Sequence, residues 1–339
     1  MSQQAPAPAA ARRLEPSDVA RAQAIVERIG TSFRSRVVGQ GNLQLSLVVA
    51  LMTGGHVLLE SVPGLAKTTA AATLADAVQG SFTRIQCTPD LLPADIVGTQ
   101  VYEPATGQFS TQLGPVHANF VLLDEINRSS AKTQSAMLEA MQERQTSIGG
   151  VIHELPKPFV VLATQNPIEQ EGTYELPEAQ LDRFLLKEIL TYPSHAEEIE
   201  ILDRIEREVF DQDLPAGSQV SLDEVRYLQG VVKGVYLDPA IKSYIVALVQ
   251  ATRPPSRALG ERLGRYLTCG ASPRASITFQ QVARALAVVA GRTYVIPEDV
   301  QRLRHQVLRH RIILNFEAVS DRVTAEQVVD AVFAATPTP

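Results

Sequence analysis

One segment of the chain, SVPGLAKT at residues 61–68, contains the residue types that bind phosphate groups. An apolar run at 56–60 precedes it and an alanine-rich helical run at 68–78 follows it, which predicts a turn between a strand and a helix. Backbone N–H groups at such a turn bind phosphate oxygens beside the positive end of the helix. We therefore expect Lys67 to contact the β and γ phosphates of a nucleotide, and Thr68 to bind Mg²⁺.

This segment departs from the usual pattern of phosphate-binding loops, GxxxxGK[ST], at two positions. Ser61 and Ala66 stand where the pattern has glycine, and neither adopts as many backbone conformations as glycine does. An ordinary strand-to-helix turn with a solvated Lys67 is the alternative. The two substitutions leave the affinity for nucleotide open.

Two adjacent carboxylates, Asp124 and Glu125, follow the apolar run at 120–123. They are expected at the carboxyl edge of a parallel sheet, where ligands bind. Asp124 can hold Mg²⁺ through its water shell, and Glu125 can orient and polarise the attacking water in phosphoryl transfer. The alternative is an exposed acidic turn. However, a phosphate-binding loop and an acidic pair about 57 residues apart, each at a strand end, together favour nucleotide hydrolysis.

The elements that must position these residues follow from hydrophobic periodicity. Apolar runs at 56–60, 120–123, 159–163 and 184–190 predict buried parallel strands, with helices at 68–78 and 132–143 among them. After Tyr192 and Pro193 the sequence pattern is mainly helical. Capping residues and first-turn prolines predict where four helices begin: at Ser221 to Glu224, at Ser272 with Pro273, at Pro297, and at Thr324 to Gln327. We therefore expect a disordered tail at 1–15, an α/β domain at 16–192 and a helical domain at 193–339.

Composition excludes several classes of protein. The 339 residues are 45% hydrophobic, enough for two compact units, and the formal net charge of −6 is spread without blocks that would indicate nucleic-acid or membrane binding. Cys87 and Cys269 lack the spacing of a disulfide framework or a zinc site, which fits a reducing, cytoplasmic setting. No apolar run approaches the roughly 18 residues that a membrane span needs. The six histidines are scattered without metal-ligand spacing.

Three stretches together resemble the MoxR family of AAA+ ATPases: SVPGLAKTT, LLDEINRSSAKTQSAMLEAMQE and LATQNPIEQEGTYELPEAQLDRF. The resemblance covers roughly residues 37–333. It implies an α/β fold in which helices sandwich a five-stranded parallel P-loop AAA+ sheet, followed by a smaller all-α lid domain. It also implies that the protein uses ATP and Mg²⁺, that it forms a homo-oligomeric ring with six subunits as the expected number, and that it hydrolyses ATP between subunits.

The resemblance assigns further residues to the site. Asn166 is similar to the sensor 1 residue, Arg183 to the arginine finger, and Arg274 to the sensor 2 arginine at the start of a lid helix. The respective alternatives are a turn-forming asparagine, a surface arginine paired with Asp182, and a plain surface arginine. The residues expected to bind nucleotide are Val38, Gly39 and Gln40 on the adenine side and Ser61, Val62, Pro63, Gly64, Leu65, Ala66, Lys67, Thr68 and Thr69 around the phosphates.

Two predicted hairpins bear on the partner. The run at about 98–116 resembles the family's helix 2 insert, and the run at about 145–157, with a turn at Gly149-Gly150, resembles the hairpin before sensor 1. The resemblance implies a protein substrate, with one that contains a von Willebrand factor A domain as the candidate. A helicase-like nucleic-acid motor is an alternative, but Lys and Arg are absent between Arg84 and Arg128 and between Arg144 and Lys157. A nucleotide-gated scaffold that does not hydrolyse ATP is a further alternative.

Overall fold

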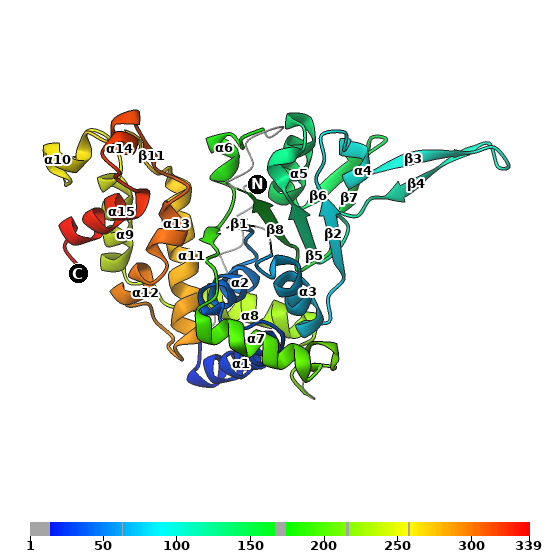
Figure 1. Ribbon diagram of the computed structural model, residues 1–339, viewed down its shortest axis with the longest axis horizontal. Coiled ribbons are helices and arrows are strands. Elements are labelled where there is room, and N and C mark those ends of the chain that lie inside the picture. Colours follow the sequence, from blue (N-terminus) through cyan, green and yellow to red (C-terminus); the bar gives the residue numbers. More distant parts are fainter. Residues whose placement is uncertain (1–13, 63, 167–173, 215–216, 257) are drawn as a thin grey trace, which may run out of the picture.

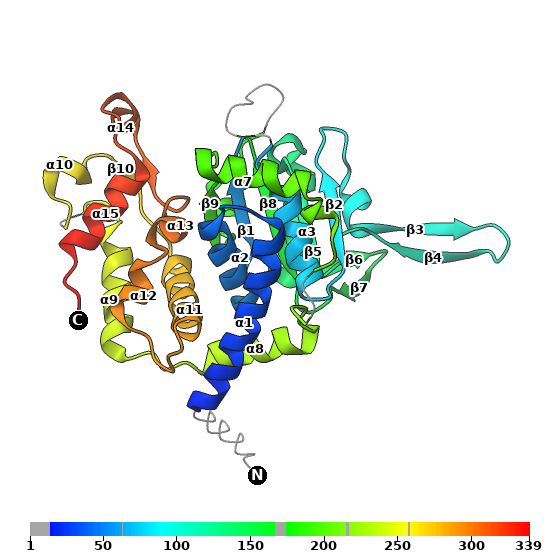
Figure 2. The same ribbon diagram turned by 60° about the horizontal axis from the view of Figure 1, so that its bottom comes forward.

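The structure, a computed structural model, describes residues 14–62, 64–166, 174–214, 217–256 and 258–339. Pro63 of the predicted phosphate-binding loop, and all but the last two residues of the predicted tail, lie outside the described residues. An α/β unit and a helical lid lie side by side, and a long hairpin projects from the α/β unit on the side away from the lid (Figure 1, Figure 2).

The α/β unit is built on a five-stranded parallel sheet, which confirms the predicted fold class. The strands lie in the spatial order β2 (Phe82–Gln86), β5 (Phe120–Asp124), β8 (Val160–Gln165), β1 (Val57–Glu60) and β9 (Leu186–Ile189). The apolar runs predict four of these strands correctly. They do not predict β2, because it lies at the edge of the sheet and only Ile85 of its residues is buried.

Side chains of the strands alternate between the two faces of the sheet, and each face has its own layer of helices. The face that contains Val57 and Leu59 packs against a layer made of α1 (Pro16–Arg36), α2 (Gly41–Thr53) and α3 (Lys67–Ala77). The face that contains Leu58 packs against α4 (Pro93–Val97) and α5 (Ala131–Glu143). Met137, Leu138 and Met141 lie on the buried face of α5.

Both predicted hairpins form. In the first, β3 (Gly98–Glu103) pairs antiparallel with β4 (Gln108–Leu113), and this ribbon extends into solvent (Figure 1). In the second, β6 (Gln145–Ile148) pairs with β7 (Val151–Glu154) across Gly149 and Gly150. Both glycines have positive φ values, 58° and 82°, as a tight two-residue hairpin turn requires.

Two helices connect the sheet to the lid and lie against the α/β unit. They are α7 (His195–Glu206), followed by the short turn η2 (Val209–Asp211), and α8 (Leu222–Gly234). Arg204 of α7 donates hydrogen bonds to the carbonyl oxygens of Arg34 and Ser35 at the end of α1, at 2.8 Å and 3.2 Å. Helix α8 packs beside α1 and α2. Val209 lies in η2 and not in α7.

The lid is helical apart from one small antiparallel pair. Its elements are α9 (Pro239–Ala251), α10 (Gly260–Gly264), β10 (Leu267–Cys269), α11 (Pro273–Val289), α12 (Pro297–Gln301), α13 (Arg304–Leu308), β11 (Ile313–Leu314), α14 (Phe316–Ser320) and α15 (Ala325–Ala335). The predicted helix starts are confirmed: Ser221, Ser272 and Thr324 accept capping hydrogen bonds, and Pro297 opens α12. Among the described helices, none is long and apolar enough to cross a membrane.

Candidate active site

The predicted phosphate-binding loop leaves β1 and enters α3. The Ser61 N–H donates to the Gln165 carbonyl oxygen at 3.2 Å, which fixes the start of the loop beside the end of β8. Gly64 and Ala66 have φ values of 86° and 52°. Ala66 thus adopts the left-handed conformation that normally belongs to glycine, at a cost of about 1–2 kcal/mol. The altered loop therefore still delivers Lys67 as the first residue of α3.

Two observations show that this loop fits a phosphate chain. The first N–H groups of α3 have no partners within the helix, as at every helix N-terminus, and they form the positive end of its dipole. The Ser61 Oγ is buried and has no hydrogen-bond partner among the described residues. A buried hydroxyl without a partner is unfavourable, so a ligand oxygen would stabilise it.

Asp124 ends β5 and is held by two neighbours. Thr164 of β8 donates to Asp124 Oδ1 at 2.8 Å, and Arg84 of β2 donates to Asp124 Oδ2 at 2.6 Å. Burial alone raises the pKa of Asp124, but the hydrogen bonds from Arg84 and Thr164 and the charge of Lys67 outweigh burial and place the pKa below its ordinary value. Asp124 is therefore ionised at neutral pH. A carboxylate next to Lys67 and Thr68 supplies the hard oxygen ligands that Mg²⁺ prefers.

Glu125 follows in a strained conformation. Its φ is 57°, which is unusual for a residue with a side chain, and such strain at a strand end is typical of functional sites. Its N–H donates to Thr164 Oγ1 at 2.8 Å. Its Oε2 accepts a hydrogen bond from Gln86 Nε2 at 3.1 Å and forms an ion pair with Arg128 Nε at 3.2 Å. The backbone and the carboxylate of Glu125 are thus both positioned by polar contacts at this edge of the sheet.

Asn166 lies directly after β8, at the same edge as Asp124, and is buried. In the sheet, Gln165 pairs with Glu60 at the end of β1. Asn166 therefore lies between the phosphate-binding loop and the acidic pair, where an amide can contact a phosphate oxygen or a water molecule.

A cavity of about 530 Å³ opens beside this loop. The predicted adenine-side residues Val38 and Gln40 line it, as do Gly64, Leu65, Ala66 and Thr69. Gly39 lies nearby with a φ of 76°, and a Cβ at this position would come within 2.4 Å of Glu197 Oε1. Apolar residues that were not predicted from the sequence line the rest of the cavity: Tyr192, Pro193, Ile201 and Phe210. A planar base bound here would contact both sets.

The two predicted arginines lie at the opposite, amino edge of the sheet. The Leu185 N–H donates to the His56 carbonyl oxygen just before β1, so Arg183 lies near the start of β1 and Lys67 beyond its end. Arg183 and Arg274 both line a cavity of about 270 Å³, together with Arg144. Asp182 does not pair with Arg183; its partner is Arg311, at 2.8 Å.

The site also contains residues that sequence reasoning missed. Arg84 and Gln86 contact Asp124 and Glu125 from β2, and Thr164 contacts both of them from β8. Arg84 and Gln86 are two residues apart, a spacing that places both side chains on one face of a strand and could have indicated that they act together. Thr164 could have been identified because its hydroxyl interrupts an apolar run.

Two family models match the chain where the α/β unit and the lid lie. The model described as "ATPase family associated with various cellular activities (AAA)" matches residues 56–186, and the model described as "AAA lid domain" matches residues 260–332. The fold and the site therefore define an ATPase of the AAA+ class.

Several proteins are similar to this chain over most of its length. "Chaperone MoxR1" of Mycobacterium tuberculosis is 47% identical over 308 residues, which cover 91% of this chain and 80% of that protein. "Protein MoxR" of Methylorubrum extorquens is 30% identical over 327 residues, which cover 89% and 92%. A crystal structure of a Cytophaga hutchinsonii protein described as an ATPase has a TM-score of 0.87 and 41% identity, covering 95% of this chain and 97% of that one. The chain belongs to the MoxR family of AAA+ ATPases.

Proposed function

We propose that this chain assembles into a ring, with six subunits as the expected number, hydrolyses MgATP at the subunit interfaces, and uses the cycle to remodel a protein partner. One observation carries the intersubunit part of this proposal. Arg183 and Arg274 share a cavity at the amino edge of the sheet, whereas Lys67 lies at the carboxyl edge. The four residues of β1 separate the two edges by about 13 Å. Two arginines on the far side of the sheet are suited to the phosphates of a neighbouring subunit.

Within one subunit, the loop N–H groups and Lys67 bind the β and γ phosphates. Thr68, and Asp124 through water, would hold Mg²⁺, which would supply positive charge to neutralise the phosphates. Glu125 orients and polarises a water molecule that attacks the γ phosphorus, and Asn166 positions that water or a γ-phosphate oxygen. As the water oxygen bonds to the γ phosphorus, the bond between that phosphorus and the oxygen that bridges to the β phosphate breaks, and the proton of the water passes to Glu125. ADP and inorganic phosphate then leave. Arg183 and Arg274 of the adjacent subunit stabilise the negative charge of the transferred group.

The proposed protein partner rests on the name of one relative, a chaperone, and on the projecting β3–β4 hairpin. This ribbon exposes Tyr102 and Phe109, which pack together at a ring-centroid distance of 5.2 Å. Aromatic side chains on an exposed ribbon suit contact with a polypeptide. A partner that contains a von Willebrand factor A domain is our candidate, and a reducing, cytoplasmic setting fits the two free cysteines.

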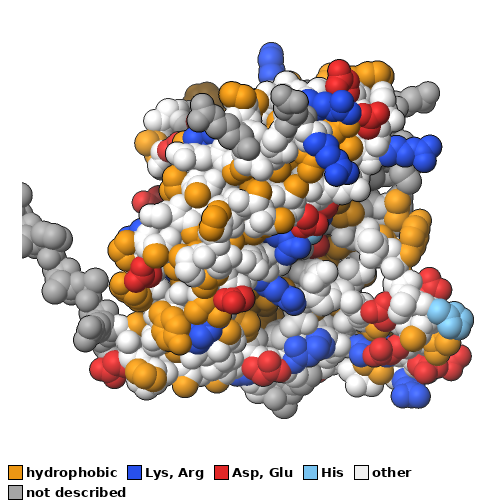
Figure 3. All heavy atoms as spheres, turned by 90° about the vertical axis from the view of Figure 1, so that its left-hand side faces the viewer, with side chains coloured by type: hydrophobic (Ala, Val, Ile, Leu, Met, Phe, Trp, Pro, Cys, Tyr) orange, Lys and Arg blue, Asp and Glu red, His pale blue; other side chains and the backbone are white. Residues whose placement is uncertain are grey.

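Binding to nucleic acid has less support. Neither hairpin has a basic residue in its ribbon, and a motor that tracks a phosphate backbone needs such residues. The outer face of the lid also has acidic, basic and hydrophobic side chains intermixed, without a broad area of positive charge (Figure 3). The absence of a basic track favours a protein partner over a nucleic-acid strand.

A mixing experiment tests the intersubunit mechanism. Arg183→Ala should bind ATP normally but turn over more slowly, on the order of 10³-fold, since a finger arginine is worth that much in comparable enzymes. Arg274→Ala should behave in the same way with a smaller loss. Mixing either variant with Lys67→Ala in equal amounts should restore activity, because about a quarter of random interfaces then join an intact pocket to intact arginines.

A mixture of the two arginine variants is the control for this experiment. Arg183→Ala and Arg274→Ala change the same side of the interface, so mixing these two should restore less activity than mixing either with Lys67→Ala. Full turnover by a monomer, or failure of Lys67→Ala to rescue Arg183→Ala, would contradict the proposed mechanism.

A further inference from the structure

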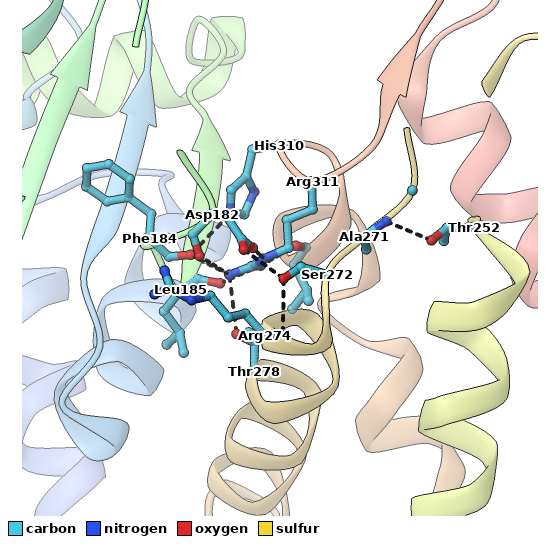
Figure 4. Close-up of polar contacts among 12 residues, drawn as sticks. Asp182, Phe184, Leu185, Thr252, Ala271, Ser272, Arg274, Thr278, His310 and Arg311 are labelled. Carbon is cyan, nitrogen blue, oxygen red and sulfur yellow. Dashed lines mark hydrogen bonds and ion pairs between the residues drawn. The ribbon is translucent and has the colours of Figure 1, made fainter. Parts of the chain in front are cut away.

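A buried arginine joins the lid to the sheet at the edge that bears Arg183 and Arg274. Arg311 lies between α13 and β11 of the lid, and its side chain is only 1% exposed (Figure 4). Its Nε donates to Asp182 Oδ1 at 2.8 Å, and its Nη2 donates to the Phe184 carbonyl oxygen at 2.6 Å. One lid side chain thus contacts both the side chain and the backbone of the segment that leads into β9.

Asp182 extends this contact to a second lid element. Its Oδ2 accepts a hydrogen bond from Ser272 Oγ at 2.7 Å, so both carboxylate oxygens have partners (Figure 4). Ser272 is also the N-cap of α11, since its Oγ accepts the Arg274 N–H at 3.1 Å. Arg311 in turn donates to Thr278 Oγ1 on the same helix at 3.3 Å. The three residues Arg311, Asp182 and Ser272 form what we term the hub.

The hub holds the two backbone segments that carry the predicted trans arginines. Asp182 directly precedes Arg183, and Ser272 lies two residues before Arg274. Burial lowers the pKa of Arg311 to about 10, and the ion pair with Asp182 opposes this decrease, so the guanidinium stays charged at neutral pH. A buried ion pair is weak evidence for stability by itself, because desolvation offsets the attraction, but its directional contacts fix a geometry.

We propose that Arg311 is a positioning residue for the intersubunit reaction, which holds Arg183 on the sheet and Arg274 on the lid in one arrangement around the γ phosphate of the neighbouring subunit. This inference rests on the proposed function above. Arg311 is itself buried and does not touch the nucleotide. Its effect on the reaction therefore passes through the backbone of Asp182 and Ser272, and any movement of the lid changes the separation of the two arginines.

The competing explanation is that Arg311 only stabilises the contact between sheet and lid. The two explanations differ in which side of the interface fails. Loss of stability would impair both the nucleotide pocket and the trans arginines of the variant subunit. Loss of positioning would leave the pocket around Lys67 intact and affect only the side that carries Arg183.

The test uses the full chain with Arg311→Met, which keeps the bulk of the side chain but removes its hydrogen bonds. ATP affinity should stay within about twofold, while turnover should fall about 10- to 100-fold, as expected when catalytic groups are displaced by about 1 Å. Mixing with Lys67→Ala should restore activity, and mixing with Arg183→Ala should not. Ser272→Ala removes the hydrogen bond to Asp182 and the cap of α11 but leaves the Arg311–Asp182 pair, and it should show the same mixing pattern with a smaller loss.

Arg292→Met is the matched control. Arg292 forms a partly buried ion pair with Asp299 at 2.5 Å, but both residues belong to the lid and neither contacts the sheet segment before β9. This variant should keep its turnover even if its thermal stability falls as much as that of Arg311→Met.

Two results would overturn the positioning role alone. In the first, mixing Arg311→Met with Arg183→Ala restores ATP turnover. In the second, mixing Arg311→Met with Lys67→Ala does not restore turnover, although mixing Arg183→Ala with Lys67→Ala does. If Arg311→Met does not fold, Ser272→Ala decides the matter by the same two mixtures. If Lys67→Ala rescues neither Arg183→Ala nor Arg311→Met, the proposed intersubunit function fails, and the positioning role fails with it.

Discussion

The two edges of the sheet differ in how completely one chain pairs the carboxylates Asp124 and Glu125 at one edge and the arginines Arg183 and Arg274 at the other. At the carboxyl edge, Asp124 and Glu125 have polar partners on β2 and β8. At the amino edge, Arg183 donates one hydrogen bond, to the Leu138 carbonyl oxygen, and its Nε is buried without a partner among the described residues. The exposed Arg274 guanidinium forms no hydrogen bond or ion pair within the described part of the chain.

This difference separates two tasks. The carboxyl edge carries the described groups that we propose bind nucleotide and orient water, and its two carboxylates are held by partners within the chain. At the amino edge the backbone is fixed by the hub, while the charged ends of the side chains remain available to a ligand from outside the chain. The comparison predicts that changes at the carboxyl edge act within a subunit, whereas changes at the amino edge act on its neighbour.

The largest expected effect separates binding from chemistry at the carboxyl edge. Lys67→Ala should abolish ATP binding, because we propose that Lys67 contacts the phosphates directly. Glu125→Gln should preserve ATP binding but lower turnover on the order of 10²- to 10⁴-fold, because it removes the group that polarises water. Equilibrium binding of a fluorescent ATP analogue and steady-state phosphate release measure the two effects.

Glu206→Gln, on the exposed side of α7, is the control for the loss of a carboxylate and should change neither quantity. Equal loss of binding in Lys67→Ala and Glu125→Gln would show that the division of roles at the carboxyl edge is wrong.

The next largest effect concerns stability at low pH. As the pH decreases, groups at the amino edge should lower the free energy of unfolding at a higher pH than groups at the carboxyl edge. His56 lies just before β1, where its Nδ1 accepts the Val161 N–H at 3.0 Å. Burial lowers its pKa to about 4. Below pH 6.5 the unfolded chain therefore binds a proton that the folded chain does not, and stability falls as the pH decreases from 6.5 to about 4. Asp124 has a lowered pKa, so its contribution is lost only at still lower pH.

Urea unfolding at pH 7 and at pH 4.5 measures this effect. His56→Gln, which cannot be protonated, should reduce the pH-dependent difference in unfolding free energy by about 2–3 kcal/mol, since one unit of pKa shift corresponds to about 1.4 kcal/mol. His195→Gln on the exposed start of α7 should leave the difference unchanged. An unchanged difference in His56→Gln would mean that this histidine does not make the amino edge acid-sensitive.

The two edges also differ in how well the sequence predicts them. Lys67, Asp124 and Asn166 follow apolar runs that form the buried parts of β1, β5 and β8, so local patterns predict both the strands and the residues that follow those runs. Ser272 and Pro273 likewise predict the start of α11, because capping is a local interaction.

Long-range partners were not predictable in this way. Asp182 and Arg311 are separated by 129 residues, and a charged pair that is distant in sequence has no local signature. Arg84 and Asp124 are likewise distant in sequence and have no local signature. Strand β2, which contains Arg84, was not predicted at all because most of its residues are polar. Sequence therefore predicts the groups proposed to act on nucleotide, but only the fold reveals the groups that hold them.

The smallest expected effect comes from one of these holding groups at the carboxyl edge. Gln86 donates to Glu125 Oε2, the oxygen that also pairs with Arg128, so water must compete with both for this carboxylate oxygen. Gln86→Ala should raise basal turnover about two- to fivefold, because a hydrogen bond of this kind is worth on the order of 1 kcal/mol. ATP affinity should stay the same, since Gln86 contacts Glu125 and not the phosphate-binding loop. Gln250→Ala on the exposed face of α9 is the control. A decrease in turnover would instead show that Gln86 aims Glu125 at the water, and that the partners at this edge assist the reaction and do not restrain it.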